Sequence, residues 1–358
     1  MKHISEIDTK FNLKERVVVE NGLDYYRIPD PNFALYGVFL DEKEGFLRIP
    51  MDVAETVSDG VANLTHETSG GRIRFSTDSS VFELRVEYER LWPMAHMTLV
   101  GQGGFCLFEE RETDRKYVKI LPPSFADETG GYTATVNLQG GKMRNYILYF
   151  PLYNPVKGVT IGLSKGAKVG KGKAYKDVKP IVYYGSSITQ GGCASRSDNS
   201  YQAWIEKWNN VDFVNLGFSG NGKGEDEMVD YLISLDASLL VCDYNHSGVP
   251  LKWLKNTHFR LYERYRKAHP DTPILILTKT NLWEEGDYEE RVKIIYSTYR
   301  KARSRGDKNV YFLSGKSMWN SPDKVSFTID GDHPNDLGFY LMAKAVYRKM
   351  KKIDKKFE

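Results

Sequence analysis

The 358-residue sequence contains no run of 18 consecutive apolar residues, and residues 1–8 lack the apolar core of a secretory signal peptide. The first absence argues against a membrane-spanning helix, and the second argues against secretion. We therefore expect a cytoplasmic protein without a membrane partner.

Cysteine is also scarce, because only Cys106, Cys193 and Cys242 occur, an odd number at wide spacing. Such cysteines fit neither a disulfide framework nor a zinc site, and they are typical of reduced thiols. We expect a reducing compartment and no bound metal.

A large excess of one charge is missing too, since 50 basic residues stand against 47 acidic ones and the net charge is +3. This balance argues against a nucleic-acid partner. Basic residues gather at 165–179, which we interpret as a solvated linker, and at 344–356, which we interpret as a helix end that complements the helix dipole. The hydrophobic fraction of 41% is ordinary for a soluble globular protein, and the length favours two domains.

Short segments of alternating polarity fill the first half of the chain. Charged residues alternate there with Phe82, Leu84, Val86 and Tyr88, the pattern of a strand with one wet face. This arrangement predicts a β-sandwich, jelly-roll-like domain over residues 1–165. Further segments of this kind, separated by turns, lie at 72–75, 97–100, 132–136 and 156–163.

The same half is rich in aromatic residues. Their rings would either fill the interior of the sandwich, the commoner use in strands, or stack on the apolar faces of sugars. The residues concerned are Tyr25, Tyr26, Phe33, Tyr36, Trp92, Phe105, Phe108, Tyr146, Tyr149, Phe150 and Tyr153.

Residues 165–176 come next and are dominated by glycine, alanine and lysine without an apolar period, which predicts an exposed linker. Strand-like and helix-like segments then alternate through residues 178–358. This alternation predicts an α/β domain with a parallel sheet covered by helices on both faces. Strands are expected at 181–184, 211–216, 239–242, 273–278 and 310–313.

Two serines follow the first of these strands directly. The strand stops at Gly185, and Ser186 and Ser187 lie in the turn that leads to a helix expected near 201–205. Open α/β sheets bind their ligands at the carboxyl ends of the strands, so either serine is a candidate nucleophile.

A base for such a nucleophile occurs near the end of the chain. Asp330 lies three residues before His333, in a short loop ahead of a helix. One loop can thereby present an imidazole and the carboxylate that orients it, as the triad of serine hydrolases requires. Asp332 is the rival for the role of the acid.

These residues together resemble the blocks of the SGNH (GDSL-type) hydrolase family. Residues 185–188, Gly-Ser-Ser-Ile, resemble its Gly-Asp-Ser-Leu block, with Ser187 at the nucleophile position and Ser186 in place of the usual aspartate. Residues 215–222, Asn-Leu-Gly-Phe-Ser-Gly-Asn-Gly, resemble the second block, and Gly220 there fits the glycine whose amide helps to form the oxyanion hole.

The last block of the family is an Asp-x-x-His, which Asp330 and His333 match. The resemblance implies a flavodoxin-like three-layer α/β/α hydrolase domain over residues 178–358, preceded by the β-sandwich of a bacterial subgroup. It also implies a Ser187–His333–Asp330 triad that requires no metal or organic cofactor.

The third block of the family supplies an asparagine, and here the sequence departs from the pattern. Ser247 occupies the asparagine position, and Asn245 lies two residues earlier, so either is a candidate third donor to the oxyanion. His246 is expected to line the pocket. Arg196, in the loop after the nucleophile, would fix that loop, which we favour, or bind an anionic substrate group.

The expected function is that of a serine esterase or acylhydrolase acting on a small-acyl ester. The resemblance favours an acetylated carbohydrate as the small-molecule substrate. An acyltransferase that uses the same Ser-His-Asp site is one alternative. The absent asparagine motivates another, a carbohydrate-binding protein with a weakened hydrolase domain. The oligomeric state stays open.

Overall fold

The computed structural model describes residues 22–244, 248–280, 286–319 and 321–358. The chain forms two compact units: the first comprises the described residues up to Phe46 and His66–Ala174, and the second Leu47–Thr65 and Tyr175–Glu358. We expected residues 47–65 in the first domain, but they group with the second unit. The reason is that their apolar side chains, Ala54 and Val61 among them, pack into its core.

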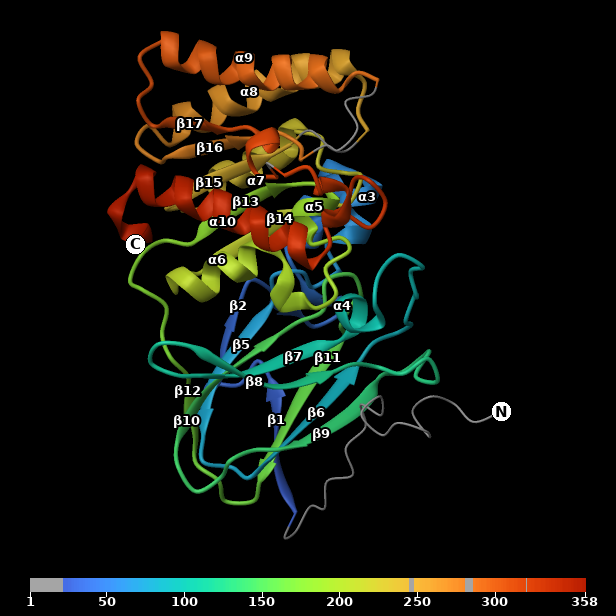
Figure 1. Ribbon diagram of the computed structural model, residues 1–358. Helices are drawn as coiled ribbons and strands as arrows, with labels where there is room; N and C mark the ends of the chain where they lie inside the picture. The colour runs from blue at the N-terminus through green and yellow to red at the C-terminus, as the bar shows by residue number, and fades with distance from the viewer. Residues whose placement is uncertain (1–21, 245–247, 281–285, 320) are drawn as a thin grey trace. The chain divides into compact units, whose positions relative to one another are not determined.

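The first unit is built from two antiparallel sheets, as expected for a β-sandwich (Figure 1). One sheet has the order β1 (Leu23–Ile28), β11 (Gly158–Ser164), β6 (Val81–Glu87), β9 (Tyr132–Asn137). The other has the order β12 (Val169–Lys171), β5 (Arg72–Thr77), β10 (Arg144–Tyr149), β7 (Phe105–Glu110), β8 (Arg115–Leu121), with β2 (Ala34–Tyr36) also paired to β5. Short elements β3 (Phe39–Asp41), β4 (Gly45–Leu47) and α4 (Leu99–Gly103) complete it.

The aromatic residues of this unit mainly form its core. The ring of Phe75 on β5 stacks on that of Phe82 on β6, with centroids 5.7 Å apart, and on that of Tyr146 on β10, with centroids 5.4 Å apart. The Phe75–Phe82 contact joins the inner faces of the two sheets, while Phe75 and Tyr146 are neighbours within one sheet. Tyr25 and Trp92, in contrast, are 46% and 60% exposed.

The segment 165–176 differs from the linker that its composition predicts. Val169–Lys171 forms the edge strand β12, antiparallel to β5, and the Thr77 hydroxyl donates a 2.8 Å hydrogen bond to the Lys168 carbonyl. Strand pairing uses backbone groups that every residue carries, so a segment of glycine and lysine can pair without an apolar pattern to reveal it.

The second unit contains a five-stranded parallel sheet. Its order is β14 (Phe213–Gly217), β13 (Ile181–Gly185), β15 (Leu239–Asp243), β16 (Ile274–Leu277), β17 (Val310–Leu313). Counted along the chain this order is 2-1-3-4-5, which is the flavodoxin-like order, and the α/β fold class expected from the sequence is confirmed.

Helices cover both faces of this sheet, because side chains along each strand alternate between the faces. Val182 and Tyr184 pack into a core with α7 (Asp226–Ser234), α8 (Leu251–Ala268) and α9 (Tyr288–Ser304), together with α2 (Met51–Val57) and α3 (Asp59–Leu64). On the opposite face the Tyr183 ring meets that of Tyr201 edge-on, with centroids 5.4 Å apart. Tyr201 begins α6 (Tyr201–Asn209), which packs beside α10 (Asp336–Ile353), as Figure 1 shows.

The strand order fixes where a ligand would bind. The strands β13 and β15 are neighbours, but β13 connects onward to β14 on its other side, so the order reverses between them. Ligands of open α/β sheets bind at such a switch point, outside the carboxyl ends of the strands. Here those ends are Gly185 and Asp243. Among the described residues, no helix has the length and apolar character that a membrane span requires.

Candidate active site

Ser187 begins the one-turn helix α5 (Ser187–Gln190), directly after β13. Gly185 makes this tight turn possible, since a Cβ there would lie 2.2 Å from the Thr189 hydroxyl and 2.9 Å from the Asp243 carbonyl oxygen. The helix ends at Gly191, whose φ of 107° suits glycine, and the amides of Gly191 and Gly192 both donate to the Ser187 carbonyl. The turn therefore holds Ser187 at the switch point of the sheet.

Three of the residues singled out in the sequence come together there. Ser187 Oγ lies 2.9 Å from His333 Nε2, although the two residues are 146 positions apart in the chain. His333 Nδ1 lies 2.7 Å from Asp330 Oδ2. With the Nδ1 proton donated to the carboxylate, Nε2 is left to accept the hydroxyl proton of the serine, which is the polarity that a nucleophile and its base require.

The loop that carries Asp330 and His333 is closed by its own backbone. Thr328 and Pro334 form an isolated antiparallel bridge, and the Ile329 amide donates a 3.0 Å hydrogen bond to the His333 carbonyl. Gly331 lies at the tip with φ 88°. This hairpin-like closure returns the imidazole to the carboxylate three residues before it.

Asp330 stays ionised because of its hydrogen bonds. Partial burial by itself would raise the pKa of the Asp330 carboxyl, but the carboxylate accepts hydrogen bonds from the amide and ring of His333 and from the Asp332 amide. Together they hold the pKa of Asp330 at about 2. A permanent negative charge beside the imidazole stabilises its protonated form.

Asp332, the rival acid, lies in a different environment. Its carboxylate Oδ1 is 2.5 Å from Lys279 Nζ, just beyond the end of β16, and its amide donates to Asp330. Of the two carboxylates, Asp330 is therefore the one that contacts the imidazole ring.

A further contact joins the loop that follows α5 to the start of α10, shortly after His333. Both the amide and the hydroxyl of Ser195 donate to the carboxylate of Asp336, over 2.8 Å and 2.5 Å. Asp336 is the first residue of α10, which Asn335 caps by accepting a 3.1 Å hydrogen bond from the Gly338 amide. This pair was not predicted from the sequence, because a serine and an aspartate 141 positions apart carry no local signal.

The turn after β14, residues 217–222, lies against the nucleophile turn. The Phe218 amide donates a 3.0 Å hydrogen bond to the Gly185 carbonyl, and the Ser219 amide donates a 2.9 Å bond to Gln190 Oε1. A Cβ on Gly222 would lie 2.1 Å from the Gly185 carbonyl oxygen, so only glycine permits this approach. We call residues 217–222 the glycine turn.

Gly220 is the residue of the glycine turn that the sequence singled out. Its φ is +67°, in the left-handed region that favours glycine. Within the part of the chain that the structure describes, the Gly220 amide has no hydrogen-bond acceptor.

A buried polar cluster supports both turns from below. The carbonyl of Thr189 accepts hydrogen bonds from the side-chain amides of Gln202 and Asn215, over 2.6 Å and 2.8 Å. The hydroxyl of Thr189 donates to Asp243 over 3.1 Å. Asn215 also accepts a 2.9 Å bond from the Gly217 amide. The cluster thereby links the nucleophile helix to the start of the glycine turn.

Cys193 lies within electrostatic range of Asp330 and Asp332, and its environment does not suit a nucleophile. It is 5% exposed and has a φ of 73°, unusual for a residue other than glycine. Burial raises the pKa of its thiol to about 12, with the charges of Asp330 and Asp332 adding to the effect. The thiol therefore stays protonated at neutral pH and does not compete with Ser187.

The remaining candidates divide into two groups. The Arg196 guanidinium contacts Asp198 at 3.0 Å and Asn199 at 3.3 Å, within its own loop, which favours the loop-fixing interpretation over substrate binding. Asn245, His246 and Ser247 lie outside the described residues, and their roles stay predictions.

Two further features bear on ligands. Among residues 22–244, 248–280, 286–319 and 321–358, no group of three or more His, Cys, Asp or Glu side chains is placed to hold a metal ion.

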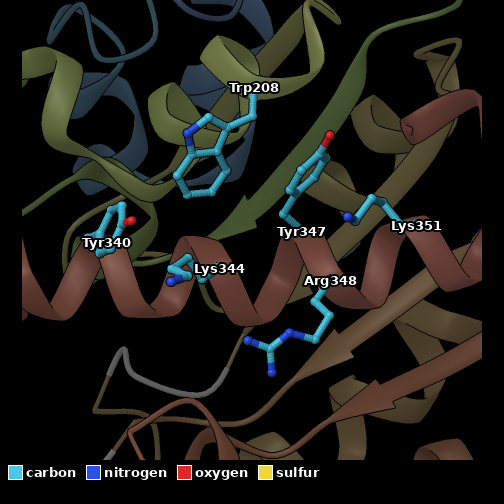
Figure 2. Close-up of a pocket in the computed structure, with 6 residues that line it drawn as sticks. All are labelled: Trp208, Tyr340, Lys344, Tyr347, Arg348 and Lys351. Atoms are coloured by element: carbon cyan, nitrogen blue, oxygen red, sulfur yellow. The ribbon is translucent and has the colours of Figure 1, made fainter.

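A pocket of about 270 Å³ lies along α6 and α10, and neither Ser187 nor His333 lines it. Figure 2 shows its lining residues, Trp208, Tyr340, Lys344, Tyr347, Arg348 and Lys351.

Comparison with known proteins agrees with this architecture. Residues 178–351 match the model of the GDSL-like Lipase/Acylhydrolase family, and residues 23–169 match the model of the N-terminus of SGNH-hydrolase-type esterases. The chain therefore belongs to the SGNH (GDSL-type) hydrolases and is an ester-hydrolysing enzyme, as the resemblance implied. No curated protein matches the sequence.

Three solved structures illustrate the likeness. A protein from Bacteroides ovatus described as a GDSL-like lipase has 27% identity and a TM-score of 0.82, over 92% of this chain and 98% of its own. A salicylyl-acyltransferase from a tetracycline biosynthetic pathway has 19% identity and a TM-score of 0.75, over 92% and 97%. An acetyl xylan esterase from Butyrivibrio proteoclasticus has 12% identity and a TM-score of 0.61, over 94% and 100%. The last two likenesses concern the fold alone.

Proposed function

We propose that this chain is a serine esterase that removes a small acyl group, acetyl in particular, from a carbohydrate ester, with Ser187, His333 and Asp330 as its catalytic triad. The observation that carries the proposal is the continuous hydrogen-bond chain from Ser187 Oγ through the imidazole of His333 to Asp330. It begins at the carboxyl end of β13, where this fold binds ligands.

The first half of the reaction acylates the serine. Ser187 Oγ attacks the ester carbonyl carbon while His333 Nε2 takes the hydroxyl proton, and the carbonyl oxygen becomes an oxyanion. Asp330, ionised because its pKa is about 2, stabilises the imidazolium. The tetrahedral intermediate collapses when Nε2 returns the proton to the leaving alcohol oxygen, so the alcohol departs and an acyl-serine remains.

The second half releases the acid. A water molecule gives a proton to His333 Nε2 and attacks the acyl carbon, and a second oxyanion forms. Its collapse breaks the bond to Ser187 Oγ, which regains the proton from the imidazolium. The carboxylic acid leaves and the free enzyme is restored without a cofactor.

The amides of Ser187 and Gly220 would stabilise both oxyanions, together with a side chain from Asn245 or Ser247. Such a donor is typically worth about 2.7 to 4 kcal/mol of transition-state stabilisation. Among the described residues, the Gly220 N–H donates to no acceptor, which supports its part in this role. Asn245 and Ser247 enter on sequence grounds alone.

The choice of substrate class draws on the relatives. Several similar structures are those of carbohydrate esterases, including the acetyl xylan esterase and an enzyme from Clostridium thermocellum in complex with cellohexaose. These substrates are those of the similar proteins, and we extend the carbohydrate class to this chain as part of the proposal.

A second candidate, transfer of the acyl group to an alcohol other than water, is favoured by one comparison. The salicylyl-acyltransferase has a higher TM-score to this chain than the acetyl xylan esterase, 0.75 against 0.61. The same acyl-serine serves both reactions, since only the attacking hydroxyl differs.

The test compares wild type with Ser187→Ala on p-nitrophenyl acetate, butyrate and octanoate. We expect turnover that falls with acyl length and is absent in the variant. Acetate release from acetylated xylo-oligosaccharides, with and without added glycerol, then separates hydrolysis from transfer. Equal turnover by wild type and Ser187→Ala would reject the proposed triad and favour the carbohydrate-binding alternative.

A further inference from the structure

The segment 47–65 precedes most of the sandwich in sequence, but it belongs to the unit that carries Ser187. Its two ends are tied together: the Arg48 amide donates a 3.0 Å hydrogen bond to the Thr65 carbonyl, and the Ile49 amide donates a 3.1 Å bond to the Thr65 hydroxyl. Its helices α2 and α3 share a core with Leu216 and Phe218, at the end of β14 and the start of the glycine turn.

Arg48 holds the beginning of the glycine turn. Its guanidinium, in a residue only 3% exposed, donates from Nη1 to the Gly217 carbonyl over 2.5 Å and to the Asn215 carbonyl over 3.4 Å. It also lies over the Phe218 ring, 4.4 Å from the centroid. Burying a guanidinium is costly unless its N–H groups are hydrogen-bonded. The bonds to the two carbonyls therefore fix the position of Arg48 and of the backbone at Asn215 and Gly217 relative to one another.

The same guanidinium reaches back into its own segment, because Nη2 donates to the Leu64 carbonyl over 2.5 Å. Arg48 is therefore a clamp between the end of α3 and the carbonyl of Gly217. A shift of α3 would move the start of the glycine turn with it.

Gly60 on α3 contacts the other end of the turn. A Cβ at Gly60 would lie 2.2 Å from Asn221 Oδ1 and 2.4 Å from Asn221 Cγ, so the absent side chain leaves the space that the amide of Asn221 fills. In this position Asn221 donates a 2.9 Å hydrogen bond to the Ser219 carbonyl and accepts one of 2.9 Å from Lys223. The bond to Ser219 spans Gly220.

We propose that Arg48 and Gly60 are positioning residues that fix the glycine turn, and through it the Gly220 amide, for oxyanion stabilisation. Arg48 secures the turn before Gly220, and Gly60 admits the side chain that secures it after Gly220. This inference rests on the proposed function, because it assigns a transition-state role to that amide. Misplacing a catalytic group by about 1 Å costs on the order of 10²-fold in rate.

The first arm of the test uses Arg48→Lys and Arg48→Met in the full chain. We expect kcat on p-nitrophenyl acetate to fall about 10- to 100-fold, with KM within about twofold, because an oxyanion donor acts mainly in the transition state. Lysine should recover part of the loss, since it keeps a donor but not the two-pronged reach of the guanidinium.

Arg266 provides the matched control. It is also a largely buried arginine of the second unit, and its guanidinium donates to the carbonyls of His269, Thr272 and Asn309. Arg266→Lys should lower the melting temperature and leave kcat within about twofold. If Arg48→Met lowers only the melting temperature in the same way, Arg48 is a structural residue and the proposal fails.

The second arm uses Gly60→Ala, which separates stability from positioning. Alanine has the higher helix propensity, so the melting temperature should not fall through loss of α3. The new methyl group would displace the Asn221 amide, and kcat should fall about 10-fold. In an Asn221→Ala background the same substitution should change kcat by less than twofold. An undiminished effect in that background would overturn the steric argument.

Hydrogen exchange at residues 217–224 keeps this test separate from that of the proposed function. Arg48→Met and Gly60→Ala should each speed amide exchange there, whereas Arg266→Lys should not. This readout needs no turnover. Failure of Ser187→Ala to abolish activity would reject the esterase mechanism, while unchanged exchange in both variants would reject the positioning role.

Discussion

Asp332 forms an ion pair with Lys279, its Oδ1 2.5 Å from Nζ, although it directly precedes His333 in the sequence. The lysine follows β16 and provides Asp332 with a cationic partner. The two carboxylates of this short loop therefore have different partners, Lys279 for Asp332 and the imidazole of His333 for Asp330.

Asp330→Asn should lower kcat by about 10³ to 10⁴, because the asparagine amide would favour the wrong tautomer of the imidazole and could not stabilise the charged imidazolium. Asp332→Asn should cost less than about 10-fold, since its carboxylate pairs with Lys279. Steady-state kinetics on p-nitrophenyl acetate measures both. Equal losses would mean that the two carboxylates share the role.

Ser187→Ala should lower kcat/KM by at least about 10³, because the attacking oxygen is removed. Ser186→Ala should remain within about 10-fold of wild type. Ser186 is 1% exposed, and its hydroxyl has no hydrogen-bond partner among the residues described. Mass spectrometry after fluorophosphonate labelling locates the adduct, and an adduct on Ser186 would reverse the assignment.

Local patterns were enough to predict much of this molecule. The buried strand at 181–184, the helix from 201 and the spacing of Asp330 and His333 are signals carried within a few residues, and the structure has β13, α6 and the closed loop at those places. Their assembly followed from the rule that parallel strands present their carboxyl ends at one edge.

The features that the sequence did not reveal depend on contacts between distant segments. Arg48 and Gly217 are 169 positions apart, and Ser195 and Asp336 are 141 apart. In the sequence, a buried arginine that donates to carbonyls cannot be told apart from an exposed charged residue in a loop. The pairing of β12 was hidden for a related reason, because backbone hydrogen bonds leave no side-chain pattern.

The third oxyanion donor is predicted from the sequence alone. If the Asn245 amide serves, Asn245→Ala should lower kcat by roughly 10² to 10³ with little change in KM. If serine has replaced the family's asparagine, Ser247→Ala should give that loss instead. Ser247→Asn is the informative companion, because a strong gain in kcat would identify a weakened hydrolase. No effect of either alanine variant would leave backbone amides as the only donors.

His258 on α8 should make the stability of the protein depend on pH. It is 2% exposed, its Nδ1 lies 2.8 Å from the Thr298 hydroxyl, and its ring stacks on Tyr244 with centroids 5.8 Å apart. Burial lowers the pKa of this imidazole from 6.5 to about 4. The folded state therefore keeps it neutral where the unfolded chain takes up a proton.

The sign of the effect follows from proton binding. Between pH 6.5 and about 4 the unfolded state binds more protons at this site, so the free energy of unfolding falls as the pH falls, by up to about 1.4 kcal/mol per pH unit. Well above pH 6.5 both states are neutral and the site contributes no slope. His258→Gln should flatten this part of the profile in urea unfolding. Thr298→Val, which keeps the buried imidazole, should lower the stability but retain the slope, and equal slopes for wild type and His258→Gln would contradict the assignment.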